Sequence, residues 1–313
     1  MTSRCDGKSR GARKALSQYD MFFQKLLSGR SWRRIVYERL TEPIHLNLVS
    51  IPVAVFGSYR AKVNFDLVVR QPYAWGLLRA ADFANLCGIK SFTAIEFGVG
   101  PGTGLMNLAK LAERTTRATG VAIRVFGFDT GTGLPPPADY RDHPELYEGG
   151  DFSMDRDTLK RALPSNAELL LGLIRETAAE FVGNIDPDSP VGFISLDVDY
   201  YSSAKDALAM LLDANPRKYL PLTVIYVDDM MEDTHNSACG ELLAIEEFNA
   251  SSIVRKIEHP RFLRTKRIFK NARWIENMHY LHVLDHPLRQ PVSKRRWPLF
   301  SPANPYLRRS GSR

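Results

Sequence analysis

The sequence predicts an α/β fold: a doubly wound, mostly parallel seven-stranded sheet with helices on both faces, of the Rossmann-like kind. Three observations predict it. Short, nearly continuous apolar runs alternate with segments of helical periodicity, which is typical of parallel strands buried beneath helices. The 313 residues are enough for one large α/β domain. Several apolar runs end in Gly or Asp, at the edge of the sheet where such folds bind their ligands.

The expected elements follow from these patterns in chain order. A helix at residues 73–89 leads into the first strand. Strands are expected at residues 91–98, 121–129, 167–173, 192–201 and 223–229, and an antiparallel edge strand at 278–285. Helices are expected at residues 104–120, 156–163, 174–182, 203–215 and 240–252.

The chain is expected to have three parts. Residues 1–50 form a basic, helical N-terminal extension, residues 51–286 form the catalytic domain, and residues 287–313 form a basic tail. The tail is rich in Pro, Ser and Arg without apolar periodicity, so we expect it to be disordered. In the extension, an amphipathic helix over residues 19–40 is expected to cover the domain or to join a homo-oligomer. Its basic face also allows contact with a membrane surface. Its apolar stripe contains Tyr19, Phe22, Phe23, Leu26 and Leu27.

The net charge of +7 is unevenly distributed. Residues 1–40 carry ten Lys and Arg against three acids, and residues 287–313 carry seven against none. Basic tails of this kind can contact acidic surfaces, whereas the acidic body suits a site that holds a cation. No specific nucleic-acid site is evident in the body.

Nothing in the sequence predicts export or membrane insertion. No apolar run approaches the roughly 20 residues that span a bilayer, and no signal-peptide pattern follows the basic N-terminus. Cys5, Cys87 and Cys239 are too few and too widely spaced for a disulfide framework or a zinc site. We therefore expect a cytoplasmic protein.

The first strand ends in the turn AIEFGVGPGTGL, which contains Glu96, Gly98, Gly100, Gly102 and Gly104. A phosphate-binding loop would end in Gly-Lys-Ser/Thr, and a dinucleotide fingerprint would read Gly-x-Gly-x-x-Gly. This turn matches neither. Its acid-x-Gly-x-Gly-x-Gly pattern resembles motif I of the class I S-adenosylmethionine-dependent methyltransferases. Glycines let such a turn approach the donor closely, and Glu96 can hold the donor's cationic groups.

The second strand ends in Asp129. A carboxylate in this position can accept hydrogen bonds from both ribose hydroxyls of an adenosine. The alternative is that Asp129 only caps the loop that follows, because Asp is common at strand ends.

Four carboxylates follow the next two parallel strands. Asp197 and Asp199 end one strand, and Asp228 and Asp229 end the other. Carboxylates that close together raise one another's pKa, and a hard divalent cation with oxygen ligands, such as Mg²⁺, would relieve the repulsion. The alternative is that Asp199 and Asp229 cap the helices that follow.

The segments FDTGTGLPPP, LDVDYYSSAKDAL and IYVDD resemble motifs of the macrocin O-methyltransferase family, over about residues 91–250. Members of that family use magnesium to methylate sugar hydroxyls. The resemblance implies metal ligands at Asp197, Asp228 and Asp229, and a donor site at Glu96, Gly98, Gly100, Gly102 and Asp129.

Two residues are candidates for catalysis, Asp197 and His235. His235 follows the Asp228-Asp229 pair, and imidazole titrates near neutrality, so it could act as a general base. It could equally cap the following helix. The long loop at residues 135–155 is expected either to close over the acceptor with Tyr140 and Tyr147 or to be solvated.

The leading hypothesis is an S-adenosylmethionine-dependent, magnesium-assisted O-methyltransferase that acts on a small molecule or sugar with a hydroxyl group. One alternative is a metal-dependent nucleotide-sugar glycosyltransferase, in which Asp197-Val198-Asp199 would be a D-x-D metal motif. That alternative leaves the glycine turn unexplained. Another is a non-catalytic binding protein on a methyltransferase fold, which would use the basic tails in strongly salt-dependent contacts.

Overall fold

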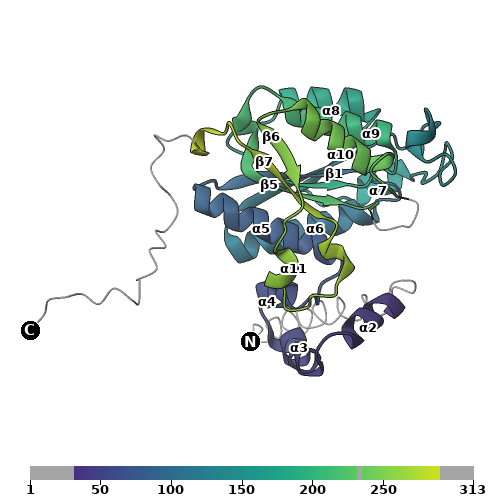
Figure 1. Cartoon of the computed structure of the whole chain (residues 1–313). Helices are drawn as coiled ribbons and strands as arrows, with labels where there is room; N and C mark the ends of the chain where they lie inside the picture. The colour runs from purple at the N-terminus through teal and green to yellow at the C-terminus, as the bar shows by residue number, and fades with distance from the viewer. Residues whose placement is uncertain (1–31, 231–234, 290–313) are drawn as a thin grey trace, which may run out of the picture.

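The protein, described by a computed structural model at residues 32–230 and 235–289, is built on a twisted seven-stranded sheet (Figure 1). The strand order is β3-β2-β1-β4-β5-β7-β6. The first five strands in this order pair in parallel, and β7 pairs antiparallel with both of its neighbours. The predicted doubly wound, mostly parallel seven-stranded fold with helices on both faces is confirmed. The strands are β1 (Ser91–Phe97), β2 (Ala122–Asp129), β3 (Ala167–Leu171), β4 (Val191–Leu196), β5 (Tyr219–Val227), β6 (Arg255–Glu258) and β7 (Met278–Val283).

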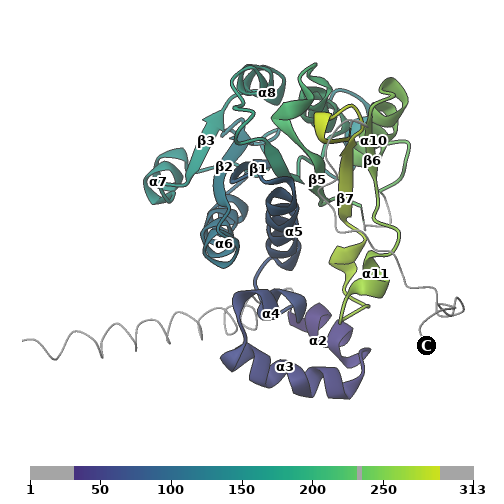
Figure 2. The same ribbon diagram turned by 90° about the vertical axis from the view of Figure 1, so that its left-hand side faces the viewer.

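Helices cover both faces of the sheet, so the molecule has two apolar cores (Figures 1 and 2). Helices α5 (Gln71–Cys87) and α6 (Thr103–Thr119) pack on one face, and the other face carries α8 (Ile174–Gly183), α9 (Tyr201–Ala209) and α10 (Gly240–Ser251). The short helix α7 (Arg156–Ala162) lies beside β3 (Figure 2). Every residue of β4 is buried, as expected for a central parallel strand between two helical layers.

Helix α6 illustrates how the sequence sets these elements. Leu105, Leu108 and Leu111 recur at helical spacing and are all buried against the sheet. The helix begins after Gly102 and ends before Gly120, and both glycines have left-handed backbone conformations. Such conformations disfavour other residues and suit helix ends.

The expectation of an edge strand at residues 278–285 was wrong in one respect. The segment forms β7 and is antiparallel, but it lies between β5 and β6, so β6 is the edge strand. The four residues of β6 were not predicted as a strand, because three of them are charged. Arg255 is nevertheless buried and pairs with Asp285 next to β7, so its charge is satisfied inside the fold.

From Trp32 onward, the structure describes three helices before α5: α2 (Trp32–Leu40), α3 (Ile44–Phe56) and α4 (Tyr59–Asn64). They lie beyond the ends of α5 and α6, beside α11 (Leu263–Lys266) (Figure 2). The boundary predicted at residue 50 falls within α3.

The helix expected over residues 19–40 is described only from Trp32, where it is helical. Its apolar stripe, Tyr19, Phe22, Phe23, Leu26 and Leu27, lies outside the described residues, as does most of the tail at 287–313.

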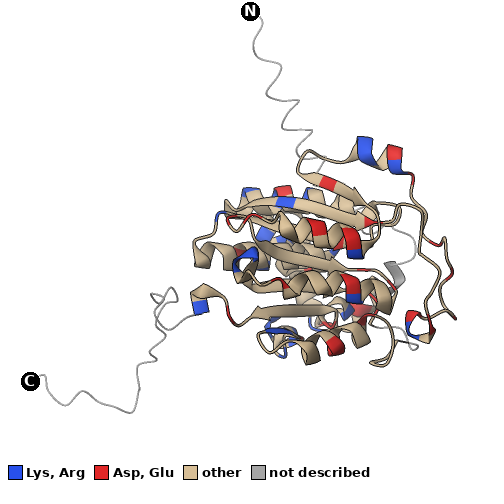
Figure 3. Ribbon diagram, turned by 90° about the horizontal axis from the view of Figure 1, so that it is seen from above, with Lys and Arg blue, Asp and Glu red and all other residues tan. Residues whose placement is uncertain are grey.

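Seen from above, the covering helices carry Lys and Arg as well as Asp and Glu (Figure 3). No helix within residues 32–230 and 235–289 is both long and apolar enough to cross a bilayer.

Candidate active site

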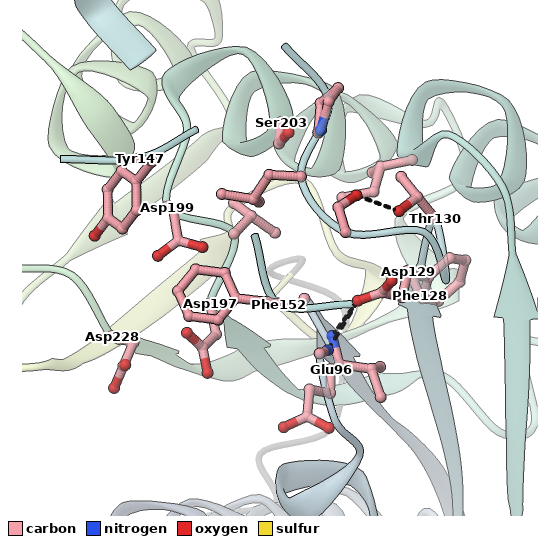
Figure 4. A pocket seen from close by; sticks show the side chains of 18 of the residues that line it. Glu96, Phe128, Asp129, Thr130, Tyr147, Phe152, Asp197, Asp199, Ser203 and Asp228 are labelled. Atoms are coloured by element: carbon pink, nitrogen blue, oxygen red, sulfur yellow. Dashed lines mark hydrogen bonds between the residues drawn. The ribbon is translucent and has the colours of Figure 1, made fainter. Parts of the chain in front are cut away.

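A cavity of about 660 Å³ opens at the carboxyl ends of the parallel strands (Figure 4). It lies where the strand order reverses, between β1, which leads to β2 and β3, and β4, which leads to β5. Ligands of doubly wound proteins bind at this position. The glycine turn after β1 and the carboxylates after β4 and β5 line the same cavity.

Three of the four glycines after β1 lie close against other parts of the protein. A Cβ at Gly98 would lie 1.5 Å from the backbone oxygen of Asp197, and a Cβ at Gly104 would lie 2.0 Å from the carboxylate of Glu96. A Cβ at Gly102 would meet the side chain of Leu159 at 2.4 Å. Gly98 and Gly104 line the cavity, whereas Gly102 starts α6 and is not among the lining residues.

Gly100 differs from the other three. Its backbone has a φ of +50°, and the nearest atom to an added Cβ is the Cβ of Phe152, at 3.7 Å. Gly100 lines the cavity. It is therefore the one glycine of the turn whose missing side chain leaves room for a ligand.

Asp129 holds the glycine turn in place. Its Oδ2 accepts hydrogen bonds from the amides of Val99 (3.0 Å) and Gly100 (2.9 Å), and its Oδ1 accepts one from Gly131 (2.6 Å). Figure 4 shows this carboxylate directed at the turn. A carboxylate offers about four lone-pair directions, so Asp129 keeps little free capacity for ribose hydroxyls. The loop-capping role considered above is present in the structure.

Glu96 is a buried carboxylate with one oxygen satisfied. Tyr73 donates to its Oε1 at 2.7 Å, and Ser195 donates in turn to the Tyr73 hydroxyl at 2.8 Å. The other oxygen, Oε2, is buried without a hydrogen-bond partner, although Glu96 lines the cavity. Burial raises the pKa of Glu96 to about 7. A buried acceptor in this state calls for a donor or a cation.

Arg70 was not predicted as a site residue. It lies at the start of α5, with a left-handed φ of +49°, and its guanidinium stands over the ring of Tyr73 at 5.3 Å and donates to Thr103. Among the described lining residues, Arg70 and Arg175 are the only basic ones. An isolated Arg before a Gln-Pro pair gave no sequence signal for this role.

The four predicted carboxylates, Asp197, Asp199, Asp228 and Asp229, all line the cavity. Burial raises the pKa of Asp197 well above its usual range, and Asp228 and Asp229 raise it further. Burial likewise raises the pKa of Asp199, and the charge of Asp228 raises it further. A cation held between these carboxylates would relieve their mutual repulsion.

The helix-cap alternative for these aspartates does not hold in the structure. The start of α9 is satisfied by Asp142 of the preceding long loop, whose Oδ1 accepts from the Ser202 amide at 2.8 Å. Helix α10 begins after Cys239 and has no side-chain cap. Asp199 and Asp229 therefore cap neither helix.

Glu241, at the start of α10, completes the cluster and was not predicted. Its Oε1 accepts from the amide of Val198 (3.0 Å) and its Oε2 from the amide of Asp229 (3.3 Å). Burial and the charge of Asp229 raise its pKa well above the usual range. It fixes both carboxylate-bearing turns. The only sequence signal was a Glu next to the Gly that opens a helix.

The donor set suits a hard cation, because it consists of carboxylate oxygens with no thiol or imidazole. Within the described residues, however, no group of three or more His, Cys, Asp or Glu side chains is arranged as a finished metal site. Magnesium binding by Asp197, Asp228 and Asp229 remains a prediction.

His235 is not among the residues that line the cavity. Its ring packs edge-on against His143, with 5.3 Å between the ring centres. Its role as a general base therefore remains a prediction. In the long loop, Tyr147 lines the cavity and Tyr140 is exposed. Phe152, which was not predicted, lines the cavity above the glycine turn with a strained φ of +59°.

Comparison with known proteins gives structural neighbours only. No family model and no curated protein matches the chain. The chain is similar to the calicheamicin methyltransferase CalS11, with 17% identity over 79% of this chain and 86% of that one and a TM-score of 0.43. It is also similar to the O-methyltransferase NovP, with 16% identity over 68% and 79% and a TM-score of 0.44. A third neighbour, the plantazolicin methyltransferase BpumL, shares 9% identity over 88% and 95%, with a TM-score of 0.29. Such low identities and scores transfer neither an activity nor a substrate to this chain.

Proposed function

We propose that the protein is an S-adenosylmethionine-dependent methyltransferase that methylates a hydroxyl group of a small molecule or sugar with the assistance of magnesium. One observation carries the proposal: a single cavity joins a glycine turn with an unsatisfied buried carboxylate to a cluster of carboxylates on the neighbouring strands. The first half suits a cationic donor, and the second suits an acceptor oxygen held near a cation.

In the donor half, the chain offers one free hydrogen-bond acceptor, at Glu96, and open space beside Gly100. Glu96 Oε2 would accept from the donor's ammonium group, which supplies the missing hydrogen bond and a compensating charge. The methionine and ribose portion would lie along Gly100, where no side chain intrudes. Asp129 would keep the turn in this shape through its bonds to the Val99 and Gly100 amides.

In the acceptor half, Asp197, Asp228 and Asp229 would hold Mg²⁺, which would lower the pKa of the acceptor hydroxyl when bound. Glu241 fixes the turns that carry these groups. The acceptor oxygen would attack the donor methyl, the carbon–sulfur bond would break, and the sulfur would leave as a neutral thioether. Asp197 is our first candidate to accept the hydroxyl proton, and His235 is the second.

The proposal is tested first by donor binding. Calorimetric titration of the full chain with S-adenosylmethionine is expected to give saturable binding, and S-adenosylhomocysteine is expected to compete for the same site. UDP-glucose, the kind of donor a glycosyltransferase would use, is expected to give no heat. Binding of the nucleotide sugar without binding of S-adenosylmethionine would contradict the proposal and favour the glycosyltransferase alternative.

A further inference from the structure

Helix α3 exposes its apolar side chains to solvent, which is unusual for a surface helix. It contains no Asp, Glu, Lys or Arg, and none of its residues is buried. Ile44, Leu48, Ile51 and Val55 follow one another at helical spacing and are exposed, the first three by 77%, 60% and 61%. An ordinary surface helix turns such a stripe toward the core.

Two of the three polar side chains of α3 are half-buried and hydrogen-bonded within the protein, whereas His45 is exposed. The amide of Asn47 donates to the backbone oxygen of Arg39 in α2 at 2.9 Å, and the hydroxyl of Ser50 donates to the backbone of Asn47 at 2.6 Å. Apart from His45, the exposed side chains of α3 are apolar. Phe56, at the end of the helix, extends this surface with 85% exposure.

The place of α3 in the molecule makes the stripe accessible. The helix is the outermost element on its side, separated by α4 from the helices that cover the sheet (Figure 2). Its 13 residues give a length of about 20 Å, which is short of the roughly 30 Å hydrocarbon core of a bilayer. The helix is therefore too short to cross a membrane, but it can lie along an apolar surface.

A second copy of the chain fits this surface poorly. A helix face about 20 Å long and about 10 Å wide covers about 200 Å², against about 800 Å² on each partner in a stable interface. The segment that leads into α2, residues 1–31, carries seven Lys and Arg against two acids.

We propose that α3 docks the protein on the surface of an anionic lipid bilayer. The exposed stripe would lie at the boundary between headgroups and acyl chains, as interfacial helices do. The excess of basic residues in the preceding segment would be attracted to the negative headgroups, since juxtamembrane Lys and Arg add to membrane affinity near such a surface. The inference is independent of the methyl-transfer chemistry.

The test is co-sedimentation of the full chain with vesicles. Vesicles of phosphatidylcholine containing phosphatidylglycerol are expected to carry the protein into the pellet, and binding is expected to weaken as salt is raised. The double variant Leu48→Glu/Ile51→Glu is expected to bind at least about tenfold more weakly, because it places charge in the apolar stripe. Ile253→Glu is the matched control, because Ile253 is 88% exposed in a loop remote in sequence from α3, and it is expected to bind like the wild type.

The single variant Ile44→Glu, together with thermal melting of each protein, separates lost docking from lost folding. The proposal is overturned if the wild type does not sediment with anionic vesicles, or sediments equally with phosphatidylcholine alone. It is also overturned if folded Leu48→Glu/Ile51→Glu binds like the wild type. A dimer in light scattering that this variant dissociates, without vesicle binding by the wild type, would assign α3 to a second copy.

Discussion

Gly100 and Gly120 have similar backbones in different surroundings. Both are left-handed, with φ of +50° and +77°, and neither has an atom within 3.4 Å of an added Cβ. Gly100 lines the cavity, whereas Gly120 ends α6. We expect Gly100→Ala and Gly120→Ala to lose similar stability, about 1 kcal/mol, since both force a side chain into an unfavourable φ.

Only Gly100→Ala is expected to weaken S-adenosylmethionine binding, by at least about tenfold, because its methyl group enters the space assigned to the donor. Calorimetric titration of both variants measures this. Equal affinity of the two variants for S-adenosylmethionine would contradict the proposal that the donor binds at the glycine turn.

Glu96 should make stability depend on pH in a particular direction. Burial raises its pKa from 4.5 to about 7, so between these values the folded chain keeps a proton that the unfolded chain releases. Its stabilising contribution is complete below pH 4.5 and is lost as pH rises through about 7. The loss is about 2–4 kcal/mol, and Glu96→Gln is expected to abolish it.

Urea denaturation of the ligand-free protein at about pH 5 and about pH 8 measures this loss. Glu113→Gln, on the exposed side of α6, serves as the control and should behave like the wild type. Asp197, Asp199 and Glu241 also have raised pKa values and keep their own share of the pH dependence in both proteins. A pH dependence in Glu96→Gln as large as that of the wild type would contradict the assignment to Glu96.

The carboxylates that line the cavity could be predicted from the sequence better than the residues that position them. Glu96, Asp197, Asp228 and Asp229 were predicted because acids stand out at the ends of apolar strands, and all four line the cavity. Tyr73 and Glu241 support them from helices distant in sequence. Such supporting roles depend on how the helices dock on the sheet, which no local pattern encodes.

At the scale of elements, β7 contains a histidine that must remain neutral. Burial lowers the pKa of His279 from 6.5 to about 4. Between these values the unfolded imidazole binds a proton that the folded one does not. Its contribution to stability is present above pH 6.5 and is lost as pH falls toward 4, by about 2–4 kcal/mol.

The variant His279→Gln is expected to lose less stability on acidification than the wild type, whatever its stability at neutral pH. Thermal melting across this pH range measures the difference. Burial also lowers the pKa of His286 to about 4, so His286 still contributes to the loss of stability at low pH in His279→Gln. His45→Gln, on exposed α3, should match the wild type, and the same acid response in His279→Gln would contradict the assignment.

The ends of β4 and β5 supply the test of the metal. Because Mg²⁺ would bind the folded cluster and not the unfolded chain, it is expected to raise the melting temperature. At a hundredfold excess of Mg²⁺ over its Kd, the free energy of unfolding is expected to rise by about 2.7 kcal/mol. Asp228→Asn is expected to remove most of this gain and to leave donor binding nearly unchanged.

Asp188→Asn, in an exposed loop, is the matched control and should keep the full response to magnesium. Melting curves of the wild type that are the same in magnesium and in EDTA, with activity retained in chelator, would leave a metal-free methyltransferase. His235 would then be tested next as the base.

Elements with strong periodicity were predicted within a few residues, as in α6 and β1. The edge strand β6 was missed because its alternation is carried by charged side chains. Arg255 is buried and forms an ion pair with Asp285, and Lys256 donates to the backbone oxygen of Asn249. Tertiary pairing made a charged segment acceptable as a strand, and the sequence offers no sign of the partners.

Across the whole molecule, a buried ion pair fastens the N-terminal helices to the C-terminal part of the domain. Arg267 donates to Asp66 and to the backbone of Val63 and Asn64, at the end of α4. Arg267→Gln is expected to destabilise the protein by about 3–5 kcal/mol, because it removes the positive charge that compensates the buried Asp66 carboxylate. The exposed pair Arg60–Asp82 is the comparison, and Arg60→Gln should cost about 1 kcal/mol or less. Urea denaturation measures both, and equal losses would contradict the structural role.

The contact between Gly98 and the backbone of Asp197 has a consequence for how such a protein can diverge. It presses the turn after β1 against the turn after β4, with no room for even a methyl group. Exposed residues such as Tyr140 in the long loop, or those of α3, can be exchanged without disturbing this contact. The two halves of the cavity, however, are inherited together.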